Sequence, residues 1–231
     1  MLENMLNANF SNLLNHIAAK SNRSDNKEWL PFIVHALDTA GIMRRLFNKW
    51  LPEHIRMELA ISINHENTLN FCVLVALLHD IGKLTPAFQK KIYRSIENYA
   101  DIIQKFGLNI TDSGEALRSP HSIAGQAILM DRKFPDEIAV IIGSHHGRGF
   151  YCKAWEQIGV FPRNYFGETE TEKKIWPGLW DEWLSYALNE TGFTIETIPK
   201  SDVKSQMLLT ALLIMADWID RKSTRLNSSH D

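Results

Sequence analysis

The sequence predicts an all-α protein in which a bundle of helices encloses one hydrophobic core. Its 231 residues suffice for one full-sized domain, and 45% apolar with 23% charged residues is the composition of a globular protein. Apolar side chains recur at three- and four-residue steps, and Thr-Pro and Ser-Pro pairs mark helix starts. The two longest apolar runs, Phe71–Leu78 and Met207–Ala216, predict helices that lie in the core.

The first two predicted helices occupy residues 31–50 and a region that ends near Gly82. In residues 31–50 the side chains at helical spacing form one face about five turns long. These side chains are Phe32, His35, Thr39, Met43 or Ile42, Leu46 and Trp50. The next helix contains FCVLVALLHD, and its apolar character on all sides predicts a central position. We expect this helix to end near Gly82, because glycine is common just beyond a helix C-terminus.

Two proline pairs predict the next helix starts. Thr85-Pro86 reads as an N-cap followed by proline at the first helical position, and it opens a helix through the Lys90–Tyr99 region. Ser119-Pro120 repeats this signal. It places His121 in the first turn of a helix that runs to about Arg132.

A further break separates that helix from the next one. Phe134-Pro135 ends the preceding helix, and the acidic residues Asp136 and Glu137 suit the first turn of a new helix. An apolar stretch over residues 138–142 then leads to His145-His146. We therefore expect both histidines at a helix end.

The remainder of the chain completes one domain over residues 1–222. Residues 150–200 are predicted to be an irregular, tryptophan-rich insertion with two short helices, because glycines and prolines interrupt the pattern. Ser201 is the expected cap of a final helix that carries MLLTALLIMADWID. Residues 223–231, STRLNSSHD, have no apolar period and are expected to be a disordered or non-native tail. The tryptophans, Trp155, Trp176, Trp180 and Trp183, are expected to pack in the core or an interface more than to stack on bases.

Composition excludes several classes of protein. The apolar runs fall short of the ~20 residues that a bilayer requires, and the first residues lack the order of a signal peptide, so the chain is expected to be cytoplasmic with no membrane partner. Only two cysteines occur, Cys72 and Cys152, which excludes a disulfide framework and a cysteine zinc site. A net charge of −2 argues against coating nucleic acid by bulk charge, although it leaves a local site open.

Seven ionisable side chains form a candidate metal-binding set. Two of them, in the pair His79-Asp80, end a strongly apolar helix, and Asp217 follows ten almost entirely apolar residues. A carboxylate buried there costs several kcal/mol unless a partner or a metal compensates it. A set rich in imidazole favours Mn, Fe, Co or Ni over Mg, which prefers oxygen. The set is His35, His79, Asp80, His121, His145, His146 and Asp217.

The order of the motifs around these side chains resembles a known family. After His35 come LLHDIGKLTPAFQ, SPHSIAG, IGSHHG and MADWID, which extend the likeness to Asp217. The chain resembles the HD superfamily of metal-dependent phosphohydrolases, and within it the HD nuclease domain of the type I CRISPR helicase-nuclease or its stand-alone form. The resemblance implies an HD-superfamily helical bundle with a bimetal site in its core.

The resemblance also implies a role for each residue. Asp80 would bridge two divalent transition metal ions, Mn, Ni, Co or Fe with Mg less favoured. Asp80 and Lys83 would be catalytic, with Lys83 facing the scissile phosphate or the leaving oxygen. The first ion would be held by His35, His79, Asp80 and Asp217, and the second by His121, His145 and His146.

The implied function is cleavage of single-stranded DNA in CRISPR interference, by two-metal activation of water. The implied partners are single-stranded DNA, a Cascade-like surveillance complex, and a helicase domain or subunit. Lys83, Arg118 and Arg148 are the candidate substrate-binding cations. The cluster Lys90–Arg94 is interpreted first as a solvated helix face.

Two other functions remain open from the sequence. One is an HD phosphohydrolase that acts on nucleotides or cyclic nucleotides with the same metals. The other is a non-catalytic HD docking module, against which the retention of all seven candidate ligands speaks. The chain is expected to be either a stand-alone subunit or a fragment of a longer helicase-nuclease.

Overall fold

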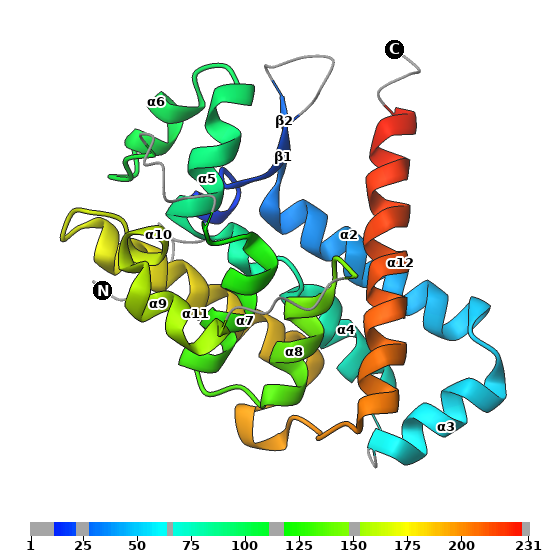
Figure 1. Cartoon of the computed structure of the whole chain (residues 1–231). Helices are drawn as coiled ribbons and strands as arrows, with labels where there is room; N and C mark the ends of the chain where they lie inside the picture. Colours follow the sequence, from blue (N-terminus) through cyan, green and yellow to red (C-terminus); the bar gives the residue numbers. More distant parts are fainter. Residues whose placement is uncertain (1–11, 22–27, 64–66, 111–117, 148–152, 228–231) are drawn as a thin grey trace.

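Helices make up 73% of the structure, which confirms the all-α prediction (Figure 1). The computed structural model describes residues 12–21, 28–63, 67–110, 118–147 and 153–227. Within these ranges one small sheet occurs, in which β1 (Ala18–Ser21) pairs antiparallel with β2 (Trp29–Pro31).

The helices follow one another along the chain, and some of the connections between them contain 3₁₀ turns. The first group is α2 (Phe32–Arg45), its π-helical continuation η1 (Leu46–Trp50), α3 (Glu53–Ile63), α4 (Thr68–Leu78), η2 (Ile81–Lys83), α5 (Pro86–Ile92), η3 (Tyr93–Ser95) and α6 (Tyr99–Gln104). The second group is α7 (His121–Asp131), α8 (Asp136–Ser144), α9 (Ala154–Val160), α10 (Pro162–Phe166), α11 (Glu172–Thr191), η5 (Ile195–Thr197) and α12 (Val203–Asn227).

Helix α4 lies at the centre of the bundle, as its apolar sequence predicts. Every residue of Phe71–Leu78 is buried, and α4 packs against α2, α8, α11 and α12 (Figure 1). The helix ends at Leu78, where the backbone tightens into η2. His79 and Asp80 therefore lie at the buried end of the central helix.

Tryptophans of α11 fix this end of α4. Trp183 Nε1 donates to the carbonyl of Leu77 at 2.9 Å, and Trp180 Nε1 donates to the carbonyl of Leu84 at 2.6 Å. The last carbonyls of a helix have no partner within the helix, so an indole N–H is a suitable donor for one of them. Both rings are buried, as is Trp176, which confirms the expected core packing, whereas Trp155 is 65% exposed.

The prediction of irregular structure over residues 150–200 is wrong for its larger part, because α11 is a continuous helix of 20 residues. Pro177 lies inside it, and proline in a helix interior costs about 3 kcal/mol. The indoles of Trp176, Trp180 and Trp183 recur at helical spacing on one buried face. Burying about 200 Å² of each at about 25 cal/mol per Å² contributes roughly 5 kcal/mol per ring, which exceeds the cost of the proline.

The predicted caps have different outcomes. Thr85 accepts from Phe88 N, so it caps α5 as expected, although this helix ends at Ile92 and does not continue to Tyr99. Ser119 does not cap α7: its hydroxyl donates to Gln157, and His121 is the first helical residue. A capping side chain must accept from a backbone N–H, but the oxygen of Ser119 instead accepts from the side-chain amide of Asn164 at 2.9 Å.

The last helix also differs from its prediction at both ends. Asp202, and not Ser201, accepts from the backbone N–H of Ser205 in the first turn of α12. The carboxylate at 202 competes with the serine for the capping position, and both residue types are good caps. At the other end α12 continues to Asn227, whereas the sequence predicts that the domain ends at residue 222. Residues 228–231 lie outside the described ranges.

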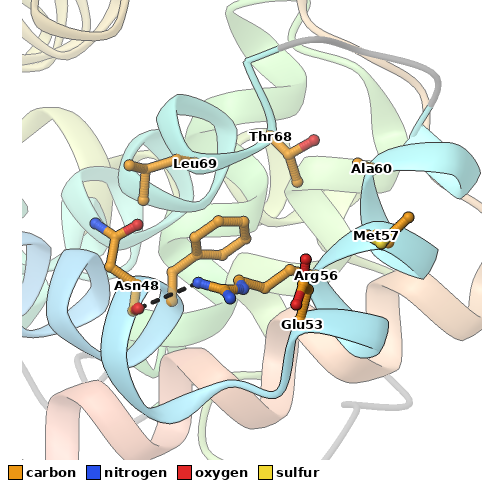
Figure 2. A pocket seen from close by; sticks show the side chains of 8 residues that line it. Asn48, Glu53, Arg56, Met57, Ala60, Thr68 and Leu69 are labelled. Carbon is orange, nitrogen blue, oxygen red and sulfur yellow. Dashed lines mark hydrogen bonds between the residues drawn. The ribbon is translucent and has the colours of Figure 1, made fainter.

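The end of the first predicted face is displaced by η1. Phe32, His35, Thr39 and Met43 are buried as expected, but Trp50 is 57% exposed because the wider π turn changes the helical phase. Beside η1 a cavity of about 400 Å³ opens between α3 and α4 (Figure 2). None of the seven candidate ligands lines it; its walls are Phe47, Asn48, Glu53, Arg56, Met57, Ala60, Thr68 and Leu69.

The start of α11 is joined to a distant loop by the buried carboxylate of Glu172. One oxygen accepts from Asn109 N at 2.8 Å, and the other accepts from the backbone N–H groups of Glu168 and Thr169, both at 3.0 Å. Burial alone raises the pKa of Glu172, but these hydrogen bonds outweigh it and hold the pKa below its usual 4.5.

Glu172→Gln is therefore expected to lower the free energy of unfolding by about 1.5–3 kcal/mol near neutral pH, since the charged acceptor is lost. The pKa of Glu172 is depressed in the folded state, so its contribution is present above the unfolded pKa and is lost as the pH falls through the folded value. Urea unfolding of both proteins as a function of pH measures the difference, which should vanish in acid. A difference that stays constant across this range would contradict the assignment.

No single helix in the described ranges is long and apolar enough to cross a membrane. Two neighbouring segments, Thr68–Lys83 and Pro86–Ser95, meet the length and composition criteria only together, and they are bent by 72° at their junction.

Candidate metal centre

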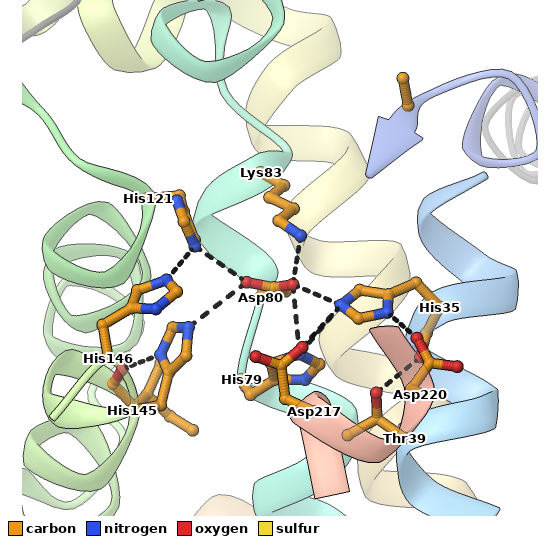
Figure 3. A network of polar contacts seen from close by, with 12 residues as sticks. His35, Thr39, His79, Asp80, Lys83, His121, His145, His146, Asp217 and Asp220 are labelled. Carbon is orange, nitrogen blue, oxygen red and sulfur yellow. Dashed lines mark hydrogen bonds and ion pairs between the residues drawn. The ribbon is translucent and has the colours of Figure 1, made fainter. Parts of the chain in front are cut away.

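All seven candidate side chains meet in one cluster at the buried end of α4 (Figure 3). They come from α2, the turn between α4 and η2, the start of α7, the end of α8, and α12. Asp80 lies in the middle and is fully buried. Donor atoms separated by up to 182 positions in sequence, from His35 to Asp217, are therefore neighbours in the fold.

The first group of donors surrounds one oxygen of Asp80. Asp80 Oδ2 lies 2.7 Å from His35 Nε2 and 3.1 Å from His79 Nε2. Asp217 Oδ1 lies 3.5 Å from His35 Nε2 and 4.0 Å from His79 Nε2. One donor atom from each of these four buried residues lies within 4.8 Å of the others, which is the spacing of a site able to hold an ion.

The second group of donors faces the other oxygen of Asp80. Asp80 Oδ1 lies 3.3 Å from His121 Nε2 and 3.5 Å from His145 Nε2, while His121 Nε2 and His146 Nε2 are 2.7 Å apart. His121, His145 and His146 form a set of three donors within 4.8 Å of one another. Asp80 thus presents one oxygen to each group (Figure 3).

Two histidines are oriented by the ends of their own helices. His79 Nδ1 donates to the carbonyl of Ala76 at 2.7 Å, and His145 Nδ1 donates to that of Ile142 at 2.6 Å. A carbonyl only accepts, so the proton must be on Nδ1 and the lone pair on Nε2, which points into the cluster. The sequence places these histidines just after α4 and α8, where helix carbonyls are free to accept.

Close contact between η2 and α7 brings the two groups together. A Cβ built on Gly82 would lie 1.9 Å from the backbone oxygen of His121 and 2.6 Å from the backbone nitrogen of Gly125. The φ angle of Gly82 is not positive. The glycine is therefore required for close approach, and not as the left-handed helix terminator that its position suggests.

Burial controls the protonation of the cluster. It lowers the pKa of His121 to about 3 and lowers that of His79, despite the attraction of Asp80. Burial alone would raise the pKa of Asp80, but Lys83 and the surrounding imidazoles hold it well below the usual value. Metal ligands must be neutral imidazoles and carboxylates, so these three groups are in the state that an ion requires.

His35 differs because carboxylates accept from both of its ring nitrogens. Nε2 lies 2.7 Å from Asp80 Oδ2, and Nδ1 lies 2.7 Å from Asp220 Oδ2. Burial and Lys83 lower the pKa of His35, but the hydrogen bonds to Asp220 and Asp80 outweigh them and raise it. The two carboxylates therefore favour the protonated form of this ring.

The residues present suit divalent metal binding. Asp80 Oδ1 and His145 Nε2 are buried, and neither makes a hydrogen bond within the described ranges. Leaving such atoms without a partner costs about 1–3 kcal/mol each, more for a charged group, and a cation held by them would offset this cost. Oxygen and imidazole nitrogen are the ligands of first-row transition metals.

The predicted substrate-binding cations have three different surroundings. Lys83 Nζ lies 2.5 Å from Asp80 Oδ2, and its side chain is 7% exposed. Arg118 is exposed and lies over the ring of Phe161, 5.9 Å from its centroid. Arg148 lies outside the described ranges. The solvated face predicted for Lys90–Arg94 is wrong for Lys90, which is buried, while Lys91 and Arg94 are exposed.

Sequence reasoning missed Asp220. Its signal is a second acid in MADWID, three residues after Asp217, so that both carboxylates leave α12 on the same side.

Comparisons with known proteins agree with this geometry. The family model described as "Cas3, HD domain" matches residues 19–220. The chain is 31% identical over 220 residues to the CRISPR-associated nuclease/helicase Cas3 of Streptococcus thermophilus. That alignment covers 87% of the chain and 24% of the relative, so the chain spans about a quarter of its length.

Solved structures share the fold. A T. fusca Cas3 structure with ADP matches 93% of the chain with a TM-score of 0.66 and 24% identity, over 24% of its own length. The Cas3 HD domain of Thermus thermophilus, solved in the presence of Ni²⁺, matches 84% of the chain and 74% of its own, with a TM-score of 0.53 and 21% identity. The family match covers most of the chain and spans every motif of the cluster; the chain belongs to the Cas3 HD-domain family of CRISPR-associated nucleases.

Proposed function

We propose that this chain hydrolyses phosphodiester bonds of single-stranded DNA in CRISPR interference, with two divalent transition metal ions, Mn, Ni, Co or Fe, at the cluster. The observation that carries the proposal is the position of Asp80 between two groups of donors, one at each of its oxygens. A helicase domain or subunit, as in the nuclease/helicase relative, and a Cascade-like surveillance complex are the proposed partners. The reaction is proposed to take place in the cytoplasm.

The chemistry divides between the ions and the residues around them. Two bound ions would lower the pKa of water and neutralise charge on the attacking and leaving oxygens of a phosphodiester. His35, His79, Asp80 and Asp217 would hold the first ion, and His121, His145 and His146 with Asp80 the second. The buried donor atoms of these residues would hold both ions in place. His121 and His146 lie at the more exposed side, so DNA is expected to approach over them.

Lys83 is proposed to bind the scissile phosphate. It pairs with Asp80 in this structure, and once Asp80 served as a metal ligand the ammonium of Lys83 would be available to an anionic substrate. Its ammonium also lies 5.5 Å from the ring centroid of Phe88, which limits where it can move.

Lys83→Met is expected to lower kcat/KM for DNA by about 10²-fold, the effect of removing one donor to transition-state charge, while two ions remain bound. Metal analysis and cleavage kinetics of the same sample measure both quantities. Lys153→Met is the matched control, because Lys153 forms an exposed ion pair with Glu156. Loss of metal in parallel with activity would instead make Lys83 a partner that only positions Asp80.

A substrate panel tests the proposal itself. The chain, loaded with Mn²⁺ after chelation, is incubated with a single-stranded oligonucleotide, its duplex, nucleotides and cyclic dinucleotides. We expect hydrolysis of the single strand and none after chelation. Hydrolysis of nucleotides with intact DNA would replace the proposal with a nucleotide phosphohydrolase, and no hydrolysis of any substrate would favour a docking module.

A further inference from the structure

The buried carboxylate of Asp220 contacts the first group of donors from outside. It is 1% exposed, and its Oδ2 lies 2.7 Å from His35 Nδ1 (Figure 3). The imidazole of His35 is therefore held at its far nitrogen, with Nε2 directed at Asp80 and Asp217.

The partner of His35 differs in kind from the partners of the other buried histidines. His79 and His145 follow the last turns of α4 and α8, so each finds a free helix carbonyl three residues earlier. His35 lies in the first turn of α2, where the preceding carbonyls are taken up by the hydrogen bonds of the continuing helix. Its Nδ1 must find an acceptor elsewhere, and α12 supplies a carboxylate.

One turn of α12 supplies two different functions. Asp217 and Asp220 are three residues apart and both buried, whereas Trp218 and Ile219 between them are 67% and 43% exposed. The two carboxylates therefore share one face of the helix. Asp217 reaches the space between the donors, while Asp220 reaches the back of His35.

We propose that Asp220 is a positioning residue of the first metal site: it accepts a hydrogen bond from His35 Nδ1, keeps Nε2 free for the ion, and makes the imidazole a stronger ligand through its negative charge. This inference rests on the proposed function, because it requires divalent ions at the cluster. A carboxylate behind a metal-bound histidine typically changes metal affinity by 10–100-fold.

The two Asp220 variants separate orientation from charge. Asp220→Ala is expected to weaken binding of Ni²⁺ at the first site by about 10–100-fold, with the second site unchanged. Asp220→Asn keeps an oxygen that can accept from Nδ1, so it should recover part of this loss. Asp38→Asn is the control, because Asp38 is exposed on α2 and interacts with Asp220 and His35 through charge alone.

Calorimetric titration of the chelated full chain with Ni²⁺ measures both affinities, and heteronuclear NMR of the His35 ring reports which nitrogen carries the proton. In the Ni²⁺-loaded parent we expect the proton on Nδ1, and in Asp220→Ala a lower occupancy of that state at equal Ni²⁺. Unchanged first-site affinity in both Asp220 variants, or equal losses at the two sites, would overturn the inference. A parent that binds no Ni²⁺ would instead refute the proposed function.

Discussion

Asp80→Asn is expected to abolish DNA cleavage, with kcat/KM reduced by at least about 10³-fold, or roughly 4 kcal/mol of transition-state stabilisation. The substitution keeps the shape of the side chain but removes the charge that both donor groups share. An amide can offer an ion only one oxygen, so metal binding at one donor group or at both should also fail. Cleavage of a single-stranded oligonucleotide with Mn²⁺, together with the metal content of the sample, measures both effects.

The stability of this variant must be controlled separately. Without Asp80 the ammonium of Lys83 is buried without its ion pair, and breaking a buried pair costs about 3–5 kcal/mol. The double variant with Lys83→Met removes that charge and should restore part of the melting temperature but none of the activity. Asp181→Asn, which alters an exposed ion pair with Arg132, is the matched control. Cleavage at the parent rate by a folded Asp80→Asn protein would remove Asp80 from the site.

Among the described glycines, Gly82 is where substitution by alanine is expected to lower the stability most. The new Cβ would meet the backbone of α7, 1.9 Å from the oxygen of His121, and backbone atoms cannot rotate away. Overpacking costs about 1–3 kcal/mol where side chains can adjust, so we expect at least about 3 kcal/mol here. For a domain of this size the melting temperature should fall by roughly 6–12 °C. The shift of η2 also moves Asp80 away from His121, so metal binding should weaken.

Gly41→Ala provides the comparison within one protein. Gly41 lies in α2, and nothing within 4 Å would meet its Cβ. Alanine there should raise the free energy of unfolding by about 0.5–1 kcal/mol, since glycine is the weaker helix former. Thermal unfolding of both variants gives the contrast. If Gly82→Ala melted at the parent temperature, the close contact between η2 and α7 would be refuted.

The part of the site that the sequence predicts is the part where a charge interrupts an apolar run. His79-Asp80 and Asp217 are recognisable because burying them has a large cost that only a partner repays. Their convergence was implied by the family resemblance, since spacing along a chain does not show which helices pack together. The structure supplies this through α4, which contacts α2, α8 and α12 at once.

The features that the sequence did not predict depend on contacts with residues distant in sequence, which outweigh local preferences. Asp220 has no local signal beyond its spacing from Asp217, because its role is set by a histidine 185 positions earlier. The helix around Pro177 forms because buried indoles outweigh a local penalty. Ser119 is a good cap by type, yet its oxygen accepts from the buried side-chain amide of Asn164 in α10. In each case a partner distant in sequence overrides a sound local preference.

The most direct measurement of the central claim is the position of bound ions in crystals of the chain grown with Mn²⁺, located by anomalous scattering. We expect two ions, one among His35, His79, Asp80 and Asp217 and one among His121, His145 and His146, with Asp80 in contact with both. No ion at the cluster, or a single ion that leaves Asp80 bound on one side only, would contradict it.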